Sequence, residues 1–217
     1  MEKTKSNTVV GEIYESHHVS GKRLGQSFEE AVRGPLFAGW IGNSNKEVLD
    51  LGGRDGVLTK YYLDGNRVTI GDADSSALEY AKNALPQINT SELNLNEQLP
   101  FPDDHFDVVV MAEVLEHLPY PNFTLFEVHR VLKRSGIFLG SIPLAYHLID
   151  RWKVLRGKKL TIAGDPTHLQ FWRYSEAVNM LCDYFQIENI KILKGGKKAY
   201  RHPDLFARDI AFLCRKQ

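Results

Sequence analysis

The feature that most constrains the fold is an alternation, beginning at residue 46, of short apolar runs with stretches of helical pattern. The first apolar run, VLDL at 48–51, stops abruptly at Gly52-Gly53, which is typical of a buried strand followed by a tight turn. The run at 106–111 holds three consecutive valines, and a strand covered on both faces is continuously apolar in this way. Strands that alternate with helices predict a parallel sheet with right-handed crossovers.

The same patterns extend along the chain and predict the remaining elements. Strands are expected at 48–51, 67–71, 90–95, 106–111, 137–142, 187–193 and 208–214. Helices are expected at 55–63, at 77–85 with Ser75-Ser76 as the cap, from Pro121 to 132 with Gly136 as the stop, at 144–155 and at 175–185. We therefore predict an α/β fold: a doubly wound, mostly parallel seven-stranded sheet with helices on both faces.

Length limits the chain to one sizeable core, because it has 217 residues and domains usually run about 100–200 residues. Residues 1–45 show no clean period, although 28–41 hold enough apolar residues for one or two short helices. We expect an N-terminal helical cap at 1–45 and the main domain at 46–217.

Acidic and basic side chains balance at 27 each, so composition gives no sign of a nucleic-acid partner. Residues 151–217 nevertheless carry 14 basic and 6 acidic side chains. The basic positions within 191–201 predict a solvated face, with contact to an anionic acceptor as the alternative. The two cysteines form no CxxC pair, the N-terminus lacks the apolar stretch of a signal peptide, and no run approaches a membrane span. We expect a cytoplasmic protein without a membrane span.

Charged and glycine residues stand at the carboxyl ends of the first two strands. Asp50 lies near the end of the first strand, and Gly52, Gly53 and Gly56 form the turn after it, where glycines let the backbone approach a ligand. Asp72 falls at the end of the second strand, where a carboxylate can accept hydrogen bonds from both hydroxyls of a ribose. The two strand ends predict a site for a nucleoside-containing cofactor.

A nicotinamide dinucleotide is the alternative cofactor. The dinucleotide fingerprint has a glycine where this chain has Arg54, whose bulk and charge oppose close approach of a pyrophosphate. Asp50 would repel a diphosphate and attract an ammonium group. The sign of this charge favours a cofactor that bears an amino acid.

Residues 46–143 resemble the class I S-adenosylmethionine-dependent methyltransferases, in particular the small-molecule group related to quinone-biosynthesis methyltransferases. Four segments in order carry the resemblance: VLDLGGRDG at 48–56, IGDADSSALEYAKN at 70–83, LNLNEQLPFPDDHFDVVVMAEVLEHL at 93–118 and EVHRVLKRSGIFLGSIP at 127–143. The resemblance implies a Rossmann-like methyltransferase fold with an antiparallel C-terminal strand, and S-adenosylmethionine as the cofactor.

The resemblance also implies a place for each matched position around the cofactor. These positions are Asp50, Gly52, Gly53 and Gly56 at the methionine part, Asp72 and Ala73 at the ribose, Asn94 and Leu95 at the adenine, and Ala112 and Glu113 where the next strand closes the pocket. Two positions depart from the family pattern, since Arg54 replaces a glycine and Asn94 replaces the commoner Asp. An amide oxygen still accepts a hydrogen bond, so we expect altered affinity rather than lost binding.

Transfer from a sulfonium needs mainly alignment and exclusion of water, and alignment alone can lower a barrier by about 7–11 kcal/mol. No metal is expected, and Glu113, Glu116 and His117 are interpreted as neighbours on a helix surface. An acceptor that is protonated when it attacks also needs a general base. The candidates for that base are His117, in the motif EVLEHL, and His147 and His168, which flank the loop after the fifth strand.

We therefore expect an enzyme that methylates an O, N or C nucleophile of a small molecule, with glycan, lipid-linked and quinone-like acceptors as alternatives. A nicotinamide-dependent oxidoreductase and a non-catalytic cofactor-binding module are the alternative functions. Residues 144–172 are predicted to form a lid insertion over the acceptor, with an apolar wall of Tyr146, Trp152, Phe171 and Trp172 beside Arg151, His147 and His168. The sequence sets no oligomeric state.

Overall fold

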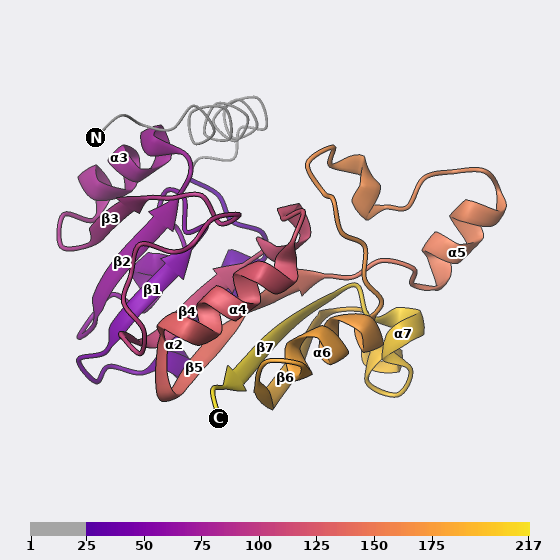
Figure 1. The fold of residues 1–217 in the computed structure, drawn as a ribbon. Helices are drawn as coiled ribbons and strands as arrows, with labels where there is room; N and C mark the ends of the chain where they lie inside the picture. Colours follow the sequence, from indigo (N-terminus) through magenta and orange to yellow (C-terminus); the bar gives the residue numbers. More distant parts are fainter. Residues whose placement is uncertain (1–24) are drawn as a thin grey trace.

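The computed structural model describes residues 25–217, and its centre is one sheet of seven strands (Figure 1). The strands are β1 (Glu47–Leu51), β2 (Arg67–Asp72), β3 (Asn89–Glu92), β4 (Phe106–Ala112), β5 (Leu132–Pro143), β6 (Gln186–Lys194) and β7 (Asp209–Arg215). They lie in the order β3-β2-β1-β4-β5-β7-β6. The strands from β3 to β5 pair in parallel, whereas β7 runs antiparallel to both β5 and β6. The predicted mostly parallel sheet with an antiparallel C-terminal strand is confirmed.

Helices cover both faces of this sheet. They are α2 (Glu30–Ile41), α3 (Ser75–Ala84), α4 (Pro121–Val131), α5 (Leu148–Leu155), α6 (Tyr174–Cys182) and α7 (Pro203–Phe206). Val108 and Val110 of β4 belong to the buried cluster that includes α2 and α3. Val109 and Met111 point to the opposite face and belong to the cluster that includes α4 and α6. Alternate residues of one strand thus enter two cores, as expected of a strand covered on both faces.

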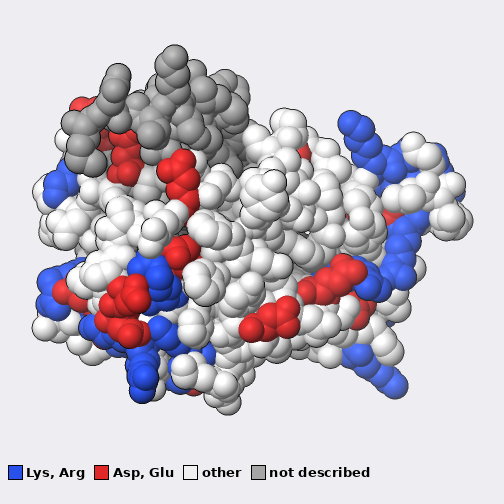
Figure 2. Space-filling view, viewed as in Figure 1, with Lys and Arg blue, Asp and Glu red and all other residues white. Residues whose placement is uncertain are grey.

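Helix α5 and the loop after it form an arm that extends away from the sheet, at the right of Figure 1. The arm carries apolar side chains that stay exposed, among them Trp152 at 56% and Leu155 at 79%. Lys and Arg side chains also gather on this arm (Figure 2). Helix α5 therefore adds little to either core, in contrast to α2, α3, α4 and α6.

The helix predicted at 55–63 is wrong, because that segment holds only a 3-10 turn, Thr59–Tyr61. Residues three apart lie one above the other in a 3-10 turn, so Thr59 and Tyr62 face the same side. Both hydroxyls donate to the buried carboxylate of Asp50, at 2.6 and 2.5 Å. A side-chain network, rather than a regular backbone ladder, shapes this segment.

Several predicted boundaries also differ from the structure. Helix α3 is capped by Asp74, whose carboxylate accepts from Ala77 N at 3.0 Å, rather than by the two serines that follow it. Helix α4 passes directly into β5 at Leu132, before the predicted stop at Gly136. The helix expected from residue 144 begins only at Leu148. The delay arises because Ala145 N bonds to Trp172 O at 2.8 Å and so belongs to an extended connection.

Two statements on organisation depend on which residues are described. The cap predicted at 1–45 falls outside the described residues up to 24, and the division of the chain into cap and domain stays a prediction. From residue 25 on, α2 packs on the sheet through Phe37 and Ile41. Among the described residues, no helix has the length and apolar character needed to span a membrane.

Candidate functional site

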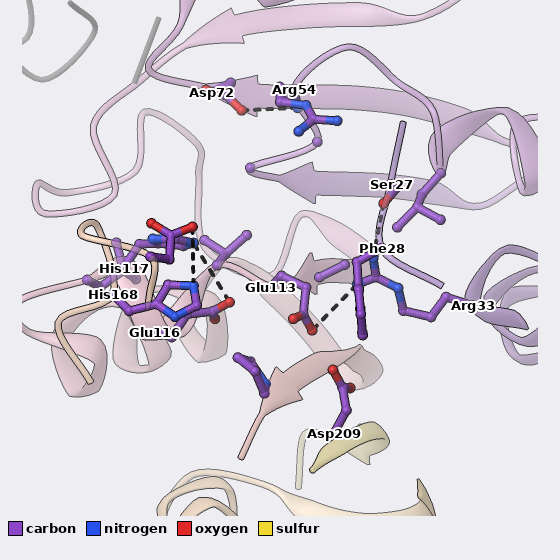
Figure 3. Close-up of a pocket in the computed structure, with 18 of the residues that line it drawn as sticks. Ser27, Phe28, Arg33, Arg54, Asp72, Glu113, Glu116, His117, His168 and Asp209 are labelled. Carbon is purple, nitrogen blue, oxygen red and sulfur yellow. Dashed lines mark hydrogen bonds and ion pairs between the residues drawn. The ribbon is translucent and has the colours of Figure 1, made fainter. Parts of the chain in front are cut away.

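A cavity of about 720 Å³ opens at the carboxyl ends of β1, β2, β4 and β5. The order of the sheet reverses between β1 and β4, and ligands of open α/β sheets bind at such a switch point. Figure 3 shows Asp72 and Arg54 together on one side of the cavity and Glu116, His117 and His168 together on another. The predicted cofactor positions, with the exception of Gly56, and the three histidines thus line one cavity.

Asp50 lines this cavity from the end of β1, with only 3% of its surface exposed. Burial raises the pKa of the Asp50 carboxyl, and the hydrogen bonds from Thr59 and Tyr62 oppose that rise. The same carboxylate raises the pKa of Tyr62 further, after burial itself. Asp50 is therefore a fixed acidic group, and its predicted contact with the methionine part of a cofactor stays a prediction.

The turn after β1 places three residues in the left-handed region of backbone conformation. Their φ angles are +72° at Gly52, +52° at Arg54 and +76° at Gly56. A Cβ at Gly52 would lie 2.5 Å from a side-chain carbon of Val114, so glycine alone fits there. Arg54 adopts a conformation that costs non-glycine residues about 1–2 kcal/mol. That cost explains a glycine at this position in the family pattern.

The side chain of Arg54 points along the rim rather than across the turn. Its Nη2 donates to Gln26 O at 2.5 Å, and its Nε donates to Asp55 Oδ1 at 3.3 Å. Asp55 Oδ2 in turn accepts from Gly25 N at 2.6 Å. Arg54 thus connects the glycine turn to the segment that precedes α2.

Asp72 ends β2, and its carboxylate accepts hydrogen bonds from the backbone of two segments, the glycine turn after β1 and the start of α3. Its Oδ2 accepts from Arg54 N at 3.0 Å, and its Oδ1 accepts from Asp74 N at 3.0 Å. Asp72 is 8% exposed and lines the cavity together with Ala73. The carboxylate therefore fixes the glycine turn against the end of β2, as the sequence placed these two features at one edge.

The turn after β3 brings Asn94, Leu95 and Asn96 to the cavity. Asn94 Oδ1 accepts from both Asn96 N and Asn96 Nδ2, each at 3.0 Å, which uses its two lone pairs. The predicted adenine contact of Asn94 stays a prediction, and it requires one of these bonds to be exchanged. Asn96 Oδ1 is buried and has no hydrogen-bond partner within residues 25–217. It is a second acceptor oxygen at this end of the cavity.

Glu113 follows β4 with φ +59° and joins a buried polar chain. Ser141 Oγ donates to Glu113 Oε1 at 2.6 Å, and Arg33 Nη1 donates to Ser141 Oγ at 2.7 Å. Arg33, which is 1% exposed, also lies 3.5 Å from the same Oε1. Burial raises the pKa of Glu113, and the positive charge of Arg33 opposes the rise. Arg33 of α2 therefore supplies the countercharge at this end of the cavity.

Glu116 and Asp209 are buried acids that lack such a partner. Glu116 is 1% exposed, and neither of its carboxylate oxygens has a hydrogen-bond partner among the described residues. Asp209 is 2% exposed, and its Oδ1 has none within 25–217. Burial, and then the charge of Glu113, raises the pKa of both carboxyls well above the usual range. The cavity thus holds acidic groups that await a hydrogen-bond donor or a cation.

The three predicted histidines all line the cavity, but their settings differ. His117 and His168 lie with their ring centres 4.7 Å apart. His147 instead caps α5, where Nδ1 accepts from Asp150 N at 3.4 Å and Nε2 lies 3.3 Å from Asp150 Oδ2. Burial lowers the pKa of His147. Its catalytic role stays a prediction, and its visible role is to begin a helix.

The apolar wall predicted within 144–172 differs from the cavity lining. None of Tyr146, Trp152, Phe171 and Trp172 lines the cavity formed by the described residues, and Arg151 does not line it either. Trp172 packs against the core instead, and Trp152 is exposed on the arm. The residues of this segment that do line the cavity are Leu144, His147, Thr161, Ile162, Asp165 and His168.

Sequence reasoning missed Arg33, Asn96 and Asp209. Arg33 had a signal, because it stands within the apolar stretch AVRGPLFAGWI, where a charged residue needs a buried partner. Asp209 had one too, since it begins the apolar run DIAFLC. Nothing in the sequence distinguishes Asn96 from an ordinary turn residue.

Comparison with known proteins gives the same fold and finds similarity to methyltransferases. Residues 49–140 match the family model of the methyltransferase domain. The ubiquinone/menaquinone biosynthesis C-methyltransferase of Psychromonas ingrahamii is 34% identical over 103 residues, which cover 43% of this chain and 41% of that protein. The chain spans about half the length, or less, of the curated relatives it first matches.

Solved structures of low sequence identity share the architecture. A SAM-dependent methyltransferase from Methanosarcina mazei superposes with a TM-score of 0.63 at 19% identity, over 84% of this chain and 97% of that one. The 1,6-didemethyltoxoflavin-N1-methyltransferase of Burkholderia thailandensis, solved with 1,6-didemethyltoxoflavin and S-adenosylhomocysteine, gives 0.67 at 16% identity, over 100% of this chain and 91% of that one. These likenesses confirm the fold. Over residues 49–140, the chain is similar to the class I S-adenosylmethionine-dependent methyltransferases, among them the quinone-biosynthesis enzymes.

Proposed function

We propose that this protein binds S-adenosylmethionine in the cavity and transfers its methyl group to a small-molecule acceptor. The observation that carries the proposal is the direct bond between Asp72 and the glycine turn, at one end of a cavity in a methyltransferase domain. The nicotinamide alternative has no comparable support, because the family match runs through both of these features.

The part of the cavity lined by Asp50, Asp72 and Asn96, here called the cofactor end, has polar groups that suit a nucleoside with an amino-acid tail. Asp72 presents its carboxylate to the cavity at the end of β2, and a carboxylate at this position can hold the hydroxyls of a ribose. Asn96 Oδ1 offers an acceptor for an adenine amino group. A carboxylate at Asp50 would suit the ammonium end of the cofactor and oppose a diphosphate.

The reaction asks the protein for alignment and for exclusion of water. When bound, S-adenosylmethionine supplies a methyl group already activated by a sulfonium. The protein orients the acceptor for in-line attack, which can lower the barrier by about 7–11 kcal/mol. The opposite part of the cavity, near Glu116 and Asp209, is called the acceptor end. Leu144 and Ile162 give it apolar lining, while His117 and His168 give it polar contacts. Either histidine can take a proton from an acceptor that attacks as a neutral hydroxyl or amine.

The nature of the acceptor follows from the size and charge of this end. The cavity also has to hold the cofactor, so the volume of about 720 Å³ leaves room for a small molecule. Lys194 and Arg208 line the acceptor end and favour an anionic group on the acceptor. The buried acids Glu116 and Asp209 favour a cation or a donor close by. We infer an acceptor of mixed polarity and no nucleic-acid partner.

The segment 144–172 is proposed to close over the acceptor through its cavity-lining loop rather than through its aromatic residues. Leu169 N and Gln170 N both donate to Glu116 O, at 2.8 and 3.0 Å, and hold the end of the segment in place. Residues around Thr161 and Ile162 line the cavity and lie further along the arm. This part of the loop can move while its end stays anchored.

A cytoplasmic location completes the proposal. Cys182 and Cys214 are both free thiols, one exposed and one buried. Burial raises the pKa of the Cys214 thiol to about 12, so this thiol stays protonated and unreactive. Free thiols are usual in reducing compartments.

The proposal is tested by incubating the full chain with S-adenosylmethionine labelled in its methyl group and a panel of glycan, lipid-linked and quinone-like acceptors. Label that passes into one class of acceptor supports the proposed function. Cofactor binding with no transfer to any class would favour a non-catalytic binding module.

A further inference from the structure

Three potential metal ligands from two distant segments meet at the acceptor end of the cavity. Glu116 and His117 belong to the 3-10 turn Leu115–His117 after β4, and His168 lies in the loop after α5. One ligand atom from each residue can be chosen so that all three lie within 4.8 Å of one another. Figure 3 shows the three side chains converging from these segments.

Backbone bonds fix this meeting of segments. The amides of Leu169 and Gln170 donate to Glu116 O, and Gln170 Nε2 donates to Leu118 O at 3.0 Å. Two residues of the loop after α5, Leu169 and Gln170, are therefore tied to the turn that carries Glu116 and His117. The cluster is set by the fold and does not depend on the chance approach of long side chains.

Both histidines are held in the way that metal-bound histidines are held. His117 Nδ1 lies 3.1 Å from Thr167 O, and His168 Nδ1 lies 3.0 Å from Ile162 O. A carbonyl oxygen only accepts, so Nδ1 is the donor in each bond, and a neutral ring then has its lone pair at Nε2. Thr167 Oγ1 also lies 3.0 Å from His117 Nδ1, and its own hydrogen is donated to Asp165 Oδ1. Donation from the far ring nitrogen to a backbone carbonyl is the usual second contact of a metal-ligating histidine.

The Nε2 atoms of these rings are near carboxylates. His117 Nε2 lies 3.8 Å from Glu116 Oε1, and His168 Nε2 lies 3.9 Å from Asp165 Oδ2. These distances exceed those of hydrogen bonds. The ligand atoms of Glu116, His117 and His168 are close enough for one ion, with ligand bonds of about 2.0–2.2 Å, to contact all three.

Glu116 gives an independent sign of an absent positive charge. The residue is 1% exposed, and neither carboxylate oxygen has a hydrogen-bond partner in the described part of the chain. Isolated buried carboxylates are among the least favourable groups in a protein interior unless they are paired or coordinate a metal. Arg33 does not fill this role, because its guanidinium is bonded to Ser141 and paired with Glu113.

We propose that Glu116, His117 and His168 bind a divalent transition-metal ion, such as zinc, at the acceptor end of the cavity. Two imidazoles and one carboxylate suit a first-row transition metal and leave coordination positions open. Asp165, whose Oδ2 lies beside His168, is placed to act as a further ligand or to orient that ring. From the sequence alone, no metal is expected, and Glu113, Glu116 and His117 are interpreted as neighbours on a helix surface. The proposed site differs, because its third ligand is His168 from a distant segment rather than Glu113.

The role of the ion rests on the proposed methyl transfer, whereas its binding does not. An acceptor oxygen at an open position would become more acidic, because a bound cation stabilises the oxyanion. The acceptor proton would then leave to solvent or to a nearby base. The oxyanion would attack the methyl carbon, so that an O–C bond forms while the S–C bond breaks and S-adenosylhomocysteine leaves with the electron pair. This assigns the acceptor to molecules that present a hydroxyl oxygen able to reach the metal.

The test is a titration of the full chain, freed of metal with a chelator, with Co²⁺ followed by its visible absorption. We expect one ion per chain and an absorption typical of mixed nitrogen and oxygen ligands. E116Q and H168A should each weaken binding by at least the 10–100-fold that loss of an outer contact of a ligand already costs. H105A, which removes an exposed histidine outside the cavity, should bind as the wild type does.

Titration of the same proteins with S-adenosylhomocysteine reports the state of the fold and keeps the two proposals apart. Variants that bind S-adenosylhomocysteine normally but bind Co²⁺ weakly support the metal site. Absence of saturable Co²⁺ binding by the wild type would overturn it, and so would equal Co²⁺ affinity in wild type, E116Q and H168A. Failure of the wild type to bind S-adenosylhomocysteine would instead contradict the proposed function.

Discussion

The two ends of the cavity differ in how their carboxylates are satisfied. At the cofactor end, Asp50 accepts two hydroxyl bonds and Asp72 accepts two backbone bonds. At the acceptor end, both oxygens of Glu116 and one oxygen of Asp209 have no hydrogen-bond partner within residues 25–217. Glu113 lies between the two ends and has its countercharge in Arg33.

At the cofactor end, groups of the protein supply the hydrogen bonds of the carboxylates. At the acceptor end, we infer that a ligand supplies them. The bonds at the cofactor end join residues of this chain that are at most 18 positions apart, so the turn is already shaped before any ligand binds. A buried polar group without a partner costs about 1–3 kcal/mol, and native structures keep few of them. Those that gather at the acceptor end therefore mark where bound groups supply the missing donors or charge.

The largest effect is expected from removing the countercharge that joins the two ends. Arg33→Met leaves Glu113 without its countercharge, and breaking a buried ion pair from one side costs about 3–5 kcal/mol. Lys60→Met breaks the exposed pair with Glu30 and should cost less than about 1 kcal/mol. Urea unfolding of both variants measures the contrast. Equal losses of unfolding free energy in the two variants would show that the Arg33–Glu113 pair contributes no more than an exposed ion pair.

The next effect concerns cofactor affinity. Asp72→Ala should weaken S-adenosylhomocysteine binding by about 1.5–3 kcal/mol, or roughly 10–150-fold, because hydrogen bonds to a charged group are lost. Calorimetric titration measures the change. Asp64→Ala, at an exposed turn residue between η1 (Thr59–Tyr61) and β2, serves as the control and should bind normally. Unchanged affinity in Asp72→Ala would break the assignment of this end to the ribose.

His147 tests whether a helix cap at the cavity wall is also a base. His147→Ala should lower the free energy of unfolding by about 1 kcal/mol, whereas His147→Asn keeps a capping side chain and should lose little. Burial lowers the pKa of His147, so the wild type should lose stability as pH falls below about 6.5, and the Asn variant should not. Thermal unfolding between pH 5 and pH 8 measures both effects.

Transfer activity of the same variants decides the chemical role of His147. A cap alone predicts that His147→Asn retains methyl transfer. Normal cofactor binding with abolished transfer in His147→Asn would establish this histidine as the base and would remove His117 and His168 from that role.

The smallest effect is a change in the pH dependence of stability from Asp209→Asn. The pKa of Asp209 is raised well above its usual value by burial and by Glu113. The stability that this group contributes is therefore present below about pH 3.8, the ordinary value for Asp, and is lost as pH rises through the raised pKa. Asn carries no such charge, so the variant should gain on the wild type as pH rises. A constant difference from pH 4 to pH 8 would show that Asp209 titrates normally.

The strands and the cofactor edge could be predicted from the sequence because their causes are local. A strand buried on both faces must be continuously apolar, and β4 has that pattern. The end of β2 at Asp72 follows from the spacing of glycine and acid along the chain. The segment at 55–63 was misjudged because its shape depends on Asp50, which a periodicity pattern cannot include.

The acceptor end could not be predicted because its contacts join distant residues. Arg33 reaches Ser141 across 108 positions, and His117 reaches Thr167 across 50. The aromatic residues of 144–172 have the composition of a pocket wall, yet their directions are set by an extended connection to Trp172 and by the exposed arm. Composition predicts that the segment 144–172 contributes to the acceptor end. Which of its side chains line the cavity depends on the fold.

Calorimetric titration of the full chain with S-adenosylhomocysteine, beside a parallel titration with NAD, tests the account most directly. The account predicts one S-adenosylhomocysteine per chain with an affinity on the order of 1 µM, together with a rise in melting temperature because the ligand binds the native state. It predicts no saturable heat from NAD. Absence of binding and of thermal shift with S-adenosylhomocysteine at about millimolar concentration, or saturable binding of NAD, would contradict the account.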